Sequence, residues 1–260
     1  MFNRKTRNSL ITIMLATAGT ALLVFTLYRE KTEPICKDTN TLIVGTNAEF
    51  PPFTFIDNNR IVGLDIYIME EVAKRMGKTI EWRDMPFDAL IPEIQLGNVH
   101  MIAAGMTPTP ERAKRIFFTK PYITKNPLVM VTRVPNQITT VTDLVGKEAI
   151  VNDGFFADEY MRTIPGVLLQ RLPTTAEAFL ALDSNRAYAY VLANNAAQPF
   201  ITKYGAHHFN VVTIPDTAET SALAIARQYP ELLTAAQQAL DDMASDGTLA
   251  TIKKTWNIND

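Results

Sequence analysis

The segment GMTPTPER, residues 105–112, places one arginine after a glycine, two threonines and two prolines. An apolar run at 101–104 precedes the segment, and a polar stretch that can begin a helix follows it. The guanidinium of Arg112 offers paired donors that match a carboxylate, and such charge-assisted bonds are strong in a partly desolvated cleft. Arginines in polar turns are, taken alone, more often solvated at the surface. We nevertheless expect an anionic group to bind here, and the rest of the chain must indicate which.

Catalytic and metal-binding motifs are absent from the sequence. The sequence contains no recognisable Ser/His/Asp arrangement and no HExxH motif. Because Cys36 is its one cysteine, it also has no CxxC motif. We therefore expect no catalytic residue, no metal ion and no cofactor.

The composition is that of a globular protein with a sizeable core. The 260 residues are 47% hydrophobic and 20% charged, which fits one or two domains. Three of the 25 basic residues, Arg4, Lys5 and Arg7, lie in the first eight positions, so 22 basic residues face 27 acidic ones in the remainder. Nucleic-acid-binding proteins usually carry an excess of basic residues, which this mildly acidic body lacks, so we expect no nucleic-acid partner.

The first 28 residues predict export from the cytoplasm. The three basic residues precede an uncharged run at 9–28, which is typical of a secretory signal peptide. The run is also long enough to span a bilayer, so an uncleaved signal anchor remains an alternative. In both cases the positive flank places the body outside the cytoplasm, and we expect a periplasmic protein, free or anchored to the inner membrane.

Residues 29–39 are charged and polar and are interpreted as a linker. Cys36 lies in this linker, after Glu33, Pro34 and Ile35. Bacterial lipoprotein signals favour a small residue directly before the cysteine, so an unmodified thiol is favoured over a lipid anchor.

The body alternates predicted strands and helices, which favours a mostly parallel sheet covered by helices. In the first half, strands are predicted at 41–46, 79–85 and 100–106, and helices at 64–76 and 87–99. In the second half, strands are predicted at 127–133, 148–153 and 187–192, and helices at 157–164 and 174–185. The tail, 230–256, predicts two helices broken at Asp246-Gly247.

Three segments in this order resemble the polar amino-acid-binding proteins of bacterial ABC importers: GTNAEFPPFTF, IVGLDIYIMEEVAKRMGK and MPFDALIPEIQLGNVHMIAAGMTPTPERAKRIFFTKPY. The resemblance covers roughly residues 40–260 and is nearest to glutamine-, histidine- and arginine-binding members. It implies a type II periplasmic-binding-protein fold, in which two α/β lobes joined by two hinge strands close on a ligand. Lobe 1 is expected at 40–127 plus 219–260 and lobe 2 at 128–218, with crossings near 127–130 and 215–222.

The resemblance also implies ligand-binding residues in lobe 1. Arg112 matches the arginine that holds the ligand's α-carboxylate, and Gly105, Met106 and Thr107 stand in the family register before it. Thr107 would add a hydroxyl donor, and the backbone of Gly105 can approach closely because it lacks a side chain. Phe50 and Phe87 match the rings that flank the ligand side chain.

Several positions depart from the family pattern. Asn47 stands where an aspartate is usual, which weakens the case for a cationic side chain; nearby Glu49 either restores the charge or is a solvated acid. In NDGFF, residues 152–156, phenylalanines replace the hydroxyl positions, and the rings narrow the cleft. The Phe156 N–H could still meet a carboxylate, and Asn152 could reach the ligand side chain.

Asn194 replaces the carboxylate that commonly holds the ligand's α-ammonium, and an uncompensated buried charge is costly. Either Asn194 and carbonyl groups suffice, or Glu49 or Asp153 substitutes, or the ligand is not an ordinary α-amino acid.

The expected function is capture of a polar or basic amino acid by a monomer that delivers it to an ABC permease in the inner membrane. The alternatives are a membrane-tethered sensor or non-transport relative of the same fold and, less favoured, a dehydratase-type enzyme.

Overall fold

The computed structural model describes residues 40–205 and 207–258. The signal or anchor segment and the linker expected at 1–28 and 29–39 lie outside the described residues. Asn40–Asp260 form one compact unit. Within the described part of the chain, no helix is both long and apolar enough to cross a membrane.

The first of two five-stranded sheets contains both the start and the end of the body. Its strand order is β5-β1-β6-β15-β7, and the strands are β1 Thr41–Thr46, β5 Thr79–Asp84, β6 Met101–Ile102, β7 Phe117–Phe118 and β15 Ala224–Ile225. β1 is parallel to both of its neighbours, with Thr41 opposite Thr79 and Val44 opposite Met101. β15 returns from late in the sequence and is antiparallel to β6 and β7. The centre of β1 is fully buried, as expected for a parallel strand covered on both faces.

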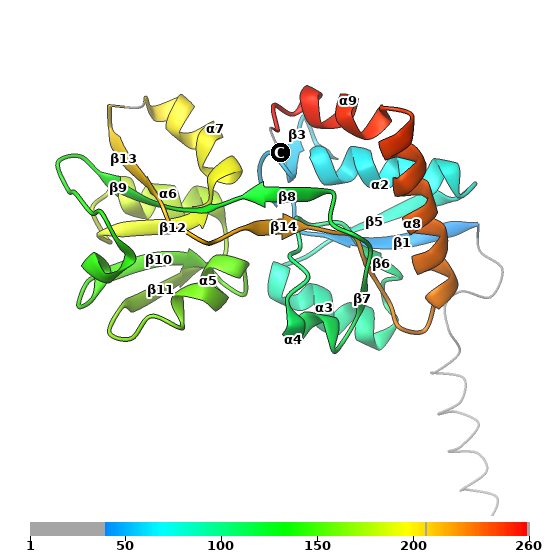
Figure 1. The fold of residues 1–260 in the computed structure, drawn as a ribbon, viewed down its shortest axis with the longest axis horizontal. Coiled ribbons are helices and arrows are strands. Elements are labelled where there is room, and N and C mark those ends of the chain that lie inside the picture. The colour runs from blue at the N-terminus through cyan, green and yellow to red at the C-terminus, as the bar shows by residue number, and fades with distance from the viewer. Residues whose placement is uncertain (1–39, 206, 259–260) are drawn as a thin grey trace, which may run out of the picture. The chain divides into compact units, whose positions relative to one another are not determined.

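Helices cover this sheet and, with it, form lobe 1 (Figure 1). They are α2 Leu64–Arg75, α3 Phe87–Leu96, α4 Pro110–Ala113, α8 Pro230–Ser245 and α9 Thr248–Thr255. α2 forms because apolar side chains recur every three or four residues, and Leu64, Ile68 and Val72 are all buried. A small sheet of β2 Glu49–Phe50, β3 Thr54–Asp57 and β4 Arg60–Val62 also belongs to lobe 1.

The second five-stranded sheet forms lobe 2 with its own helices. Its strand order is β11-β10-β12-β9-β13, and the strands are β9 Leu128–Arg133, β10 Glu148–Asn152, β11 Leu168–Leu172, β12 Ala189–Ala193 and β13 Phe209–Thr213. The helices are α5 Phe156–Met161, α6 Thr175–Asp183, α7 Asn194–Tyr204 and the short 3₁₀ helix η1 Val141–Leu144. The apolar core of lobe 2 includes Met130, Leu144, Val151, Met161 and Val191.

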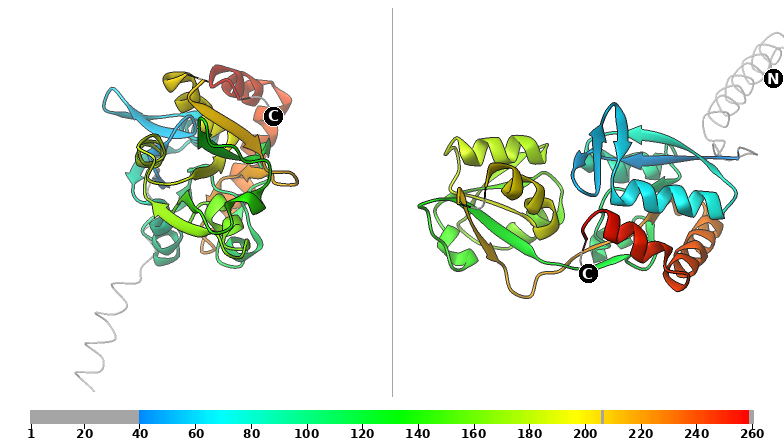
Figure 2. Two further views of the ribbon diagram at one scale, coloured as in Figure 1. Left: turned by 90° about the vertical axis from the view of Figure 1, so that its left-hand side faces the viewer. Right: turned by 90° about the horizontal axis from the view of Figure 1, so that it is seen from above.

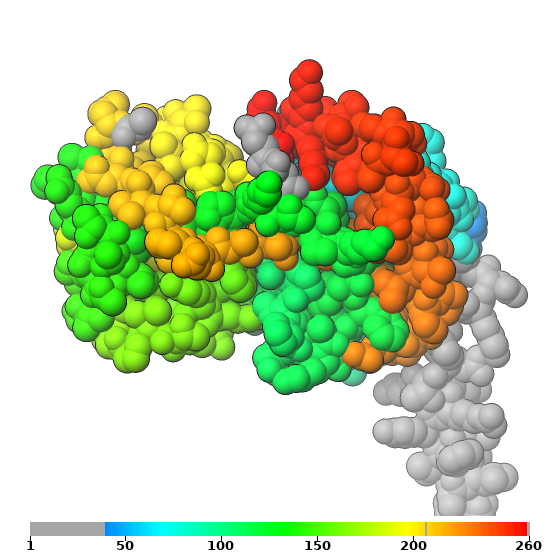
Figure 3. Space-filling view, in the orientation of Figure 1, coloured from blue at the N-terminus to red at the C-terminus, as the bar shows by residue number. Residues whose placement is uncertain are grey.

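Two antiparallel strands, β8 Ile123–Asn126 and β14 Glu219–Ser221, run between the lobes (Figures 1 and 2). The segments that contain them lie side by side on the face shown in Figure 3, in green and orange. Residues 127–130, expected as the first crossing, continue from β8 into β9. The expected return at 215–222 contains β14. The architecture thus matches the predicted two-lobed α/β fold.

Candidate functional site

Arg112 lies on the short helix α4, at the boundary between the lobes. Thr109 caps the N-terminus of the helix, and its hydroxyl accepts a hydrogen bond from the Arg112 N–H at 3.4 Å. The guanidinium is buried: Nη1 donates to the Thr107 carbonyl at 2.9 Å, and Nη2 donates to the Gly154 carbonyl of lobe 2 at 2.9 Å. Nη2 also lies 2.8 Å from Oε1 of Glu159 in α5. Both lobes therefore satisfy the charge of Arg112.

Two carboxylates act electrostatically on this guanidinium. Burial lowers the pKa of Arg112, and the negative charges of Glu159 and Glu219 oppose that shift. Glu219, at the start of β14, is itself buried, and burial raises its pKa to about 8 although Arg112 pulls it down. Asn126 of β8 donates to Glu219 at 3.4 Å, so this acid joins the two crossing strands beside the site.

The rings of Phe50 and Phe87, expected to flank a ligand, are separated by a third ring. Phe155 of lobe 2 lies with its centroid 4.2 Å from Phe87, tilted by 45°, and 5.0 Å from Phe50, edge-on at 83°. Phe53 stacks behind Phe50 at 5.1 Å. The Arg112 guanidinium lies 5.4 Å from the Phe87 centroid. The structure therefore brings Phe50, Phe87 and Arg112 together, with Phe155 among them.

Thr107 and Met106 hold the arginine-bearing turn against the crossing segment. The Thr107 hydroxyl donates to the Thr220 carbonyl at 2.8 Å, and the Met106 carbonyl accepts from the Ala222 N–H at 3.1 Å. Met106 is fully buried, and Thr107 is nearly so. Here the Thr107 hydroxyl is a donor within the protein.

Gly105 fits between an acid and a ring. Its φ of +61° lies in the left-handed region, and its N–H donates to the buried carboxylate of Asp65. A Cβ at this position would lie 3.2 Å from the Phe50 ring. Burial raises the pKa of Asp65 to about 6, and the Gly105 N–H opposes that shift.

Asn152 and Phe156 face the interior of lobe 2. The Asn152 amide donates to the Leu172 carbonyl at 3.1 Å and accepts a hydrogen bond from the Tyr190 hydroxyl. Phe156 packs against the apolar core of lobe 2.

Asn194 begins α7. Its backbone N–H donates to the Pro127 carbonyl at 2.9 Å, and its side-chain oxygen accepts from Gln198 at 3.1 Å.

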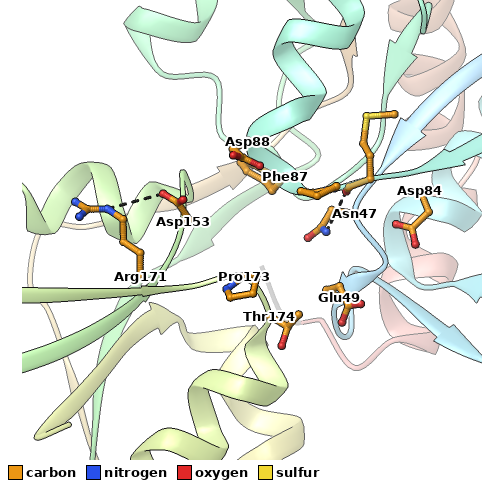
Figure 4. A pocket seen from close by; sticks show the side chains of 11 residues that line it. Asn47, Glu49, Asp84, Phe87, Asp88, Asp153, Arg171, Pro173 and Thr174 are labelled. Carbon is orange, nitrogen blue, oxygen red and sulfur yellow. Dashed lines mark hydrogen bonds and ion pairs between the residues drawn. The ribbon is translucent and has the colours of Figure 1, made fainter. Parts of the chain in front are cut away.

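A cavity of about 550 Å³ lies between the lobes, and Phe87 is among the residues that line it (Figure 4). Its polar lining comprises Asn47, Glu49, Asp84 and Asp88 from lobe 1 and Asp153, Arg171 and Thr174 from lobe 2. Of the expected ligand-binding residues, Asn47, Glu49 and Phe87 line this cavity, and the others do not: Phe50, Gly105, Met106, Thr107, Arg112, Asn152, Phe156 and Asn194. Asn47 donates to the Met85 carbonyl at 3.2 Å, while its buried side-chain oxygen has no hydrogen-bond partner.

The cavity carries an excess of negative charge. Four carboxylates face it, and the single cation, Arg171, also pairs with Asp158 at 3.0 Å, compared with 3.8 Å to Asp153. Burial raises the pKa of Glu49, and the charges of Asp84 and Glu177 add to that shift. A cation in the cavity would relieve this repulsion.

A second cavity, of about 340 Å³, lies next to the acidic cavity and is lined by Arg112. It shares Phe87 and Asp88 with the larger cavity, and Arg112, Gly154 and Glu159 line it as well. Adjacent cavities thus contain the buried arginine and the acidic cluster. Within residues 40–205 and 207–258, no group of three or more His, Cys, Asp or Glu side chains is placed to hold a metal ion.

Sequence reasoning did not identify Glu159, Asp84, Asp88 or Arg171. Glu159 follows Gly154 by five residues and lies in the first turn of α5, which is an ordinary position for a glutamate. Only the packing of the lobes shows that it meets Arg112.

The chain matches the family model of the bacterial extracellular solute-binding proteins, family 3, over residues 42–259. It is 31% identical over 220 residues to the arginine-binding extracellular protein ArtP of Bacillus subtilis (strain 168), covering 83% of this chain and 85% of the relative.

Two solved structures are similar over 84% of this chain. An ancestral arginine-binding protein bound to arginine is 33% identical with a TM-score of 0.80, and 98% of that chain is covered. The ancestral amino acid-binding protein AncCDT-1, a precursor of cyclohexadienyl dehydratase, is 31% identical with a TM-score of 0.76, and 95% of it is covered. These matches confirm the resemblance inferred from the sequence: the chain belongs to the bacterial extracellular solute-binding proteins of family 3.

Proposed function

We propose that this protein captures an amino acid outside the cytoplasm, with a preference for a basic side chain, and delivers it to an ABC permease as a monomer. One observation carries the proposal: a buried arginine and an acidic cavity lie next to each other between two lobes. A basic amino acid has the complementary charges, because it carries one carboxylate and two cationic groups. The similarity to arginine-binding proteins supports this preference.

In this proposal, lobe 1 supplies most of the groups that recognise the ligand, and lobe 2 adds Asp153. Arg112 takes the α-carboxylate through its paired donors. Glu49, Asp84, Asp88 and Asp153 attract the cationic groups, which compensates for the absence of a carboxylate at Asn194. Because groups from both lobes contact the ligand, binding favours the closed arrangement, and β8 and β14 accommodate the closure.

We propose binding without turnover. The solved relative AncCDT-1 is described as an amino acid-binding protein, although it is the precursor of a dehydratase. Incubation with radiolabelled L-arginine, followed by release and chromatography, should return the amino acid unchanged. A labelled product would overturn this part of the proposal.

The test of the proposal is a thermal-unfolding screen of the full chain, unfolded and refolded beforehand to remove any carried ligand. L-arginine, L-ornithine, L-histidine, L-glutamine and L-cystine are compared at equal concentration. A ligand that binds only the native state raises the melting temperature by mass action. The largest rise is expected with L-arginine or L-ornithine, and no rise with any amino acid would contradict amino-acid capture.

A further inference from the structure

One short segment of lobe 2 reaches into lobe 1 at three points. The segment comprises residues 154–159, which include the turn after β10 and the first residues of α5. The Gly154 carbonyl accepts from Arg112, the Phe155 ring lies among the rings of lobe 1, and the Glu159 carboxylate pairs with Arg112. The segment therefore occupies both the charged and the aromatic part of the candidate site.

The Phe155 ring is buried and contacts two rings of the other lobe. It is 7% exposed. Its ring neighbours, Phe50 and Phe87, are lobe 1 residues. The same two rings were expected to enclose the ligand side chain, so Phe155 fills the position proposed for it.

Glu159 supplies the group that Arg112 is proposed to bind. Its carboxylate lies 2.8 Å from Nη2, and its side chain is 33% exposed, whereas that of Arg112 is 6% exposed. A carboxylate at this distance satisfies the guanidinium as a ligand's carboxylate would. Two carboxylates cannot take the same donor in the same geometry, so an arriving amino acid competes with Glu159.

The turn that carries these groups is held in place from within lobe 2. Gly154 has a φ of +73°, which glycine adopts without strain, and its N–H donates to Asp158 at 3.2 Å. Asp158 is fully buried and bonds to both Arg162 and Arg171. The protrusion toward lobe 1 is therefore built into lobe 2 and is not a loose loop conformation.

We propose that Phe155 and Glu159 are an internal occupant of the binding site, which holds the lobes together and which the amino acid must displace. The inference rests on the proposed function for the identity of the displacing ligand, but the internal contact itself can be tested without any ligand. A ligand that displaces Phe155 and Glu159 breaks their contacts with lobe 1. Only a ligand with a carboxylate for Arg112 and a second group for the acidic cavity makes new contacts in their place.

The expected change in affinity depends on the fraction of molecules in which the occupant blocks the site. Apparent affinity falls in proportion to the fraction of molecules that can bind. If the occupied state holds about nine-tenths of the molecules, removing it tightens binding about tenfold.

The experiment measures lobe separation and affinity in the same variants of the full chain. Nitroxide labels are attached in a Cys36→Ser background at Leu96→Cys in lobe 1 and Leu168→Cys in lobe 2, both exposed positions, and their distance is measured by pulsed electron resonance. Glu159→Gln, Phe155→Ala and the double variant are compared with Glu148→Gln and Leu180→Ala, which change exposed side chains of lobe 2. Affinity for L-arginine is measured by calorimetry without labels.

Without added amino acid, the double variant is expected to show longer lobe-to-lobe distances than the wild type, and the two controls are not. L-arginine is expected to bind the double variant about tenfold more tightly. If the wild type and the double variant have equal distance distributions, the proposal of an internal occupant is wrong, regardless of which ligand binds. A third outcome is that distances lengthen in the double variant but L-arginine binds to neither the wild type nor any variant. This result would support the occupant and count against the proposed ligand.

Discussion

Arg112 of lobe 1 and Glu159 of lobe 2 form an ion pair with a separation of 2.8 Å, and the Arg112 side chain is almost fully buried. The cation proposed to bind the ligand is thus also a direct link between the lobes. Ligand binding and lobe contact depend on the same group, so a substitution there changes both.

Arg112→Ala should abolish high-affinity binding of L-arginine. Removing one partner of a buried charge pair costs roughly 2–5 kcal/mol, so a loss of about thirtyfold or more is expected. Arg112→Lys keeps the charge but not the paired donors and should recover only part of the affinity. Titration calorimetry measures both, with Arg133→Ala as the control, because Arg133 is exposed, pairs with Asp183 and lines neither cavity. Unchanged affinity in Arg112→Ala would remove Arg112 from the site.

Glu49→Gln should weaken binding of L-arginine more than binding of L-glutamine. Glu49 lines the acidic cavity, so its charge favours a cationic side chain. The exposed acid Glu231, replaced by glutamine, is the matched control. Equal losses for the two ligands would show that Glu49 does not select for charge.

Binding of L-arginine should weaken as the pH falls through the titration of Glu49. Burial and the neighbouring acids raise the pKa of Glu49 above its ordinary value of 4.5, so its charge is lost at a higher pH than for an exposed glutamate. Calorimetric titrations across this range, in the wild type and in Glu49→Gln, measure the effect. The Glu49 contribution to this pH dependence should be absent in the variant, and identical profiles would contradict the assignment.

Glu219 should make the protein less stable as the pH rises. Its pKa is about 8 in the fold and 4.5 in its ordinary state, so the folded protein binds more protons between these values. The free energy of unfolding therefore falls as pH rises through this window, by at most about 1.4 kcal/mol per pH unit from this group. Glu219→Gln should flatten the profile and should gain stability relative to the wild type near pH 8.

Urea unfolding at several pH values measures the effect of Glu219→Gln, with Glu231→Gln as the exposed control. Asp65 contributes a slope of the same sign between 3.8 and about 6, so the decisive comparison lies above that range. Parallel profiles of Glu219→Gln and the wild type between about pH 6 and 8 would show that Glu219 is not the titrating group.

Gly105→Ala should destabilise the fold more than Gly77→Ala. Both glycines have positive φ, +61° and +65°, where an alanine costs about 1–2 kcal/mol. A Cβ at Gly105 would also lie 3.2 Å from the Phe50 ring, whereas a Cβ at Gly77 would have open space around it. The difference in unfolding free energy between the two variants reports the contacts of the new Cβ with Phe50 and Phe53. Equal losses would mean that the ring moves aside at no cost.

Much of the fold could be predicted because its signals are local. The four-residue spacing from Leu64 predicted α2, and Asp246-Gly247 correctly separated α8 from α9. Other elements were missed, among them the short strands of the crossing segments and of the small sheet, two strands of lobe 2 and the helix α7. Leu168–Leu172 and Phe209–Thr213 are short strands, and α7 begins with two asparagines and contains Pro199, which weaken a helix signal.

The candidate site was less predictable, because lobe packing decides which side chains meet. Phe155 was expected to narrow the cleft, but its position between Phe50 and Phe87 depends on a contact more than sixty residues away in sequence. The sequence did not show that the Asn152 side chain bonds to Tyr190, because Tyr190 lies on another strand.

The central claim is that a buried arginine binds the carboxylate of a basic amino acid whose cationic groups enter the acidic cavity. Its most direct test compares L-arginine with agmatine, which has the same guanidinium but no carboxylate, in thermal unfolding of the refolded full chain. At a concentration of about 100 times Kd, a ligand stabilises the native state by about 2.7 kcal/mol, and several degrees of Tm are expected for L-arginine. Agmatine should give little or no rise. A rise with agmatine equal to that with L-arginine, or no rise with either, would contradict the account.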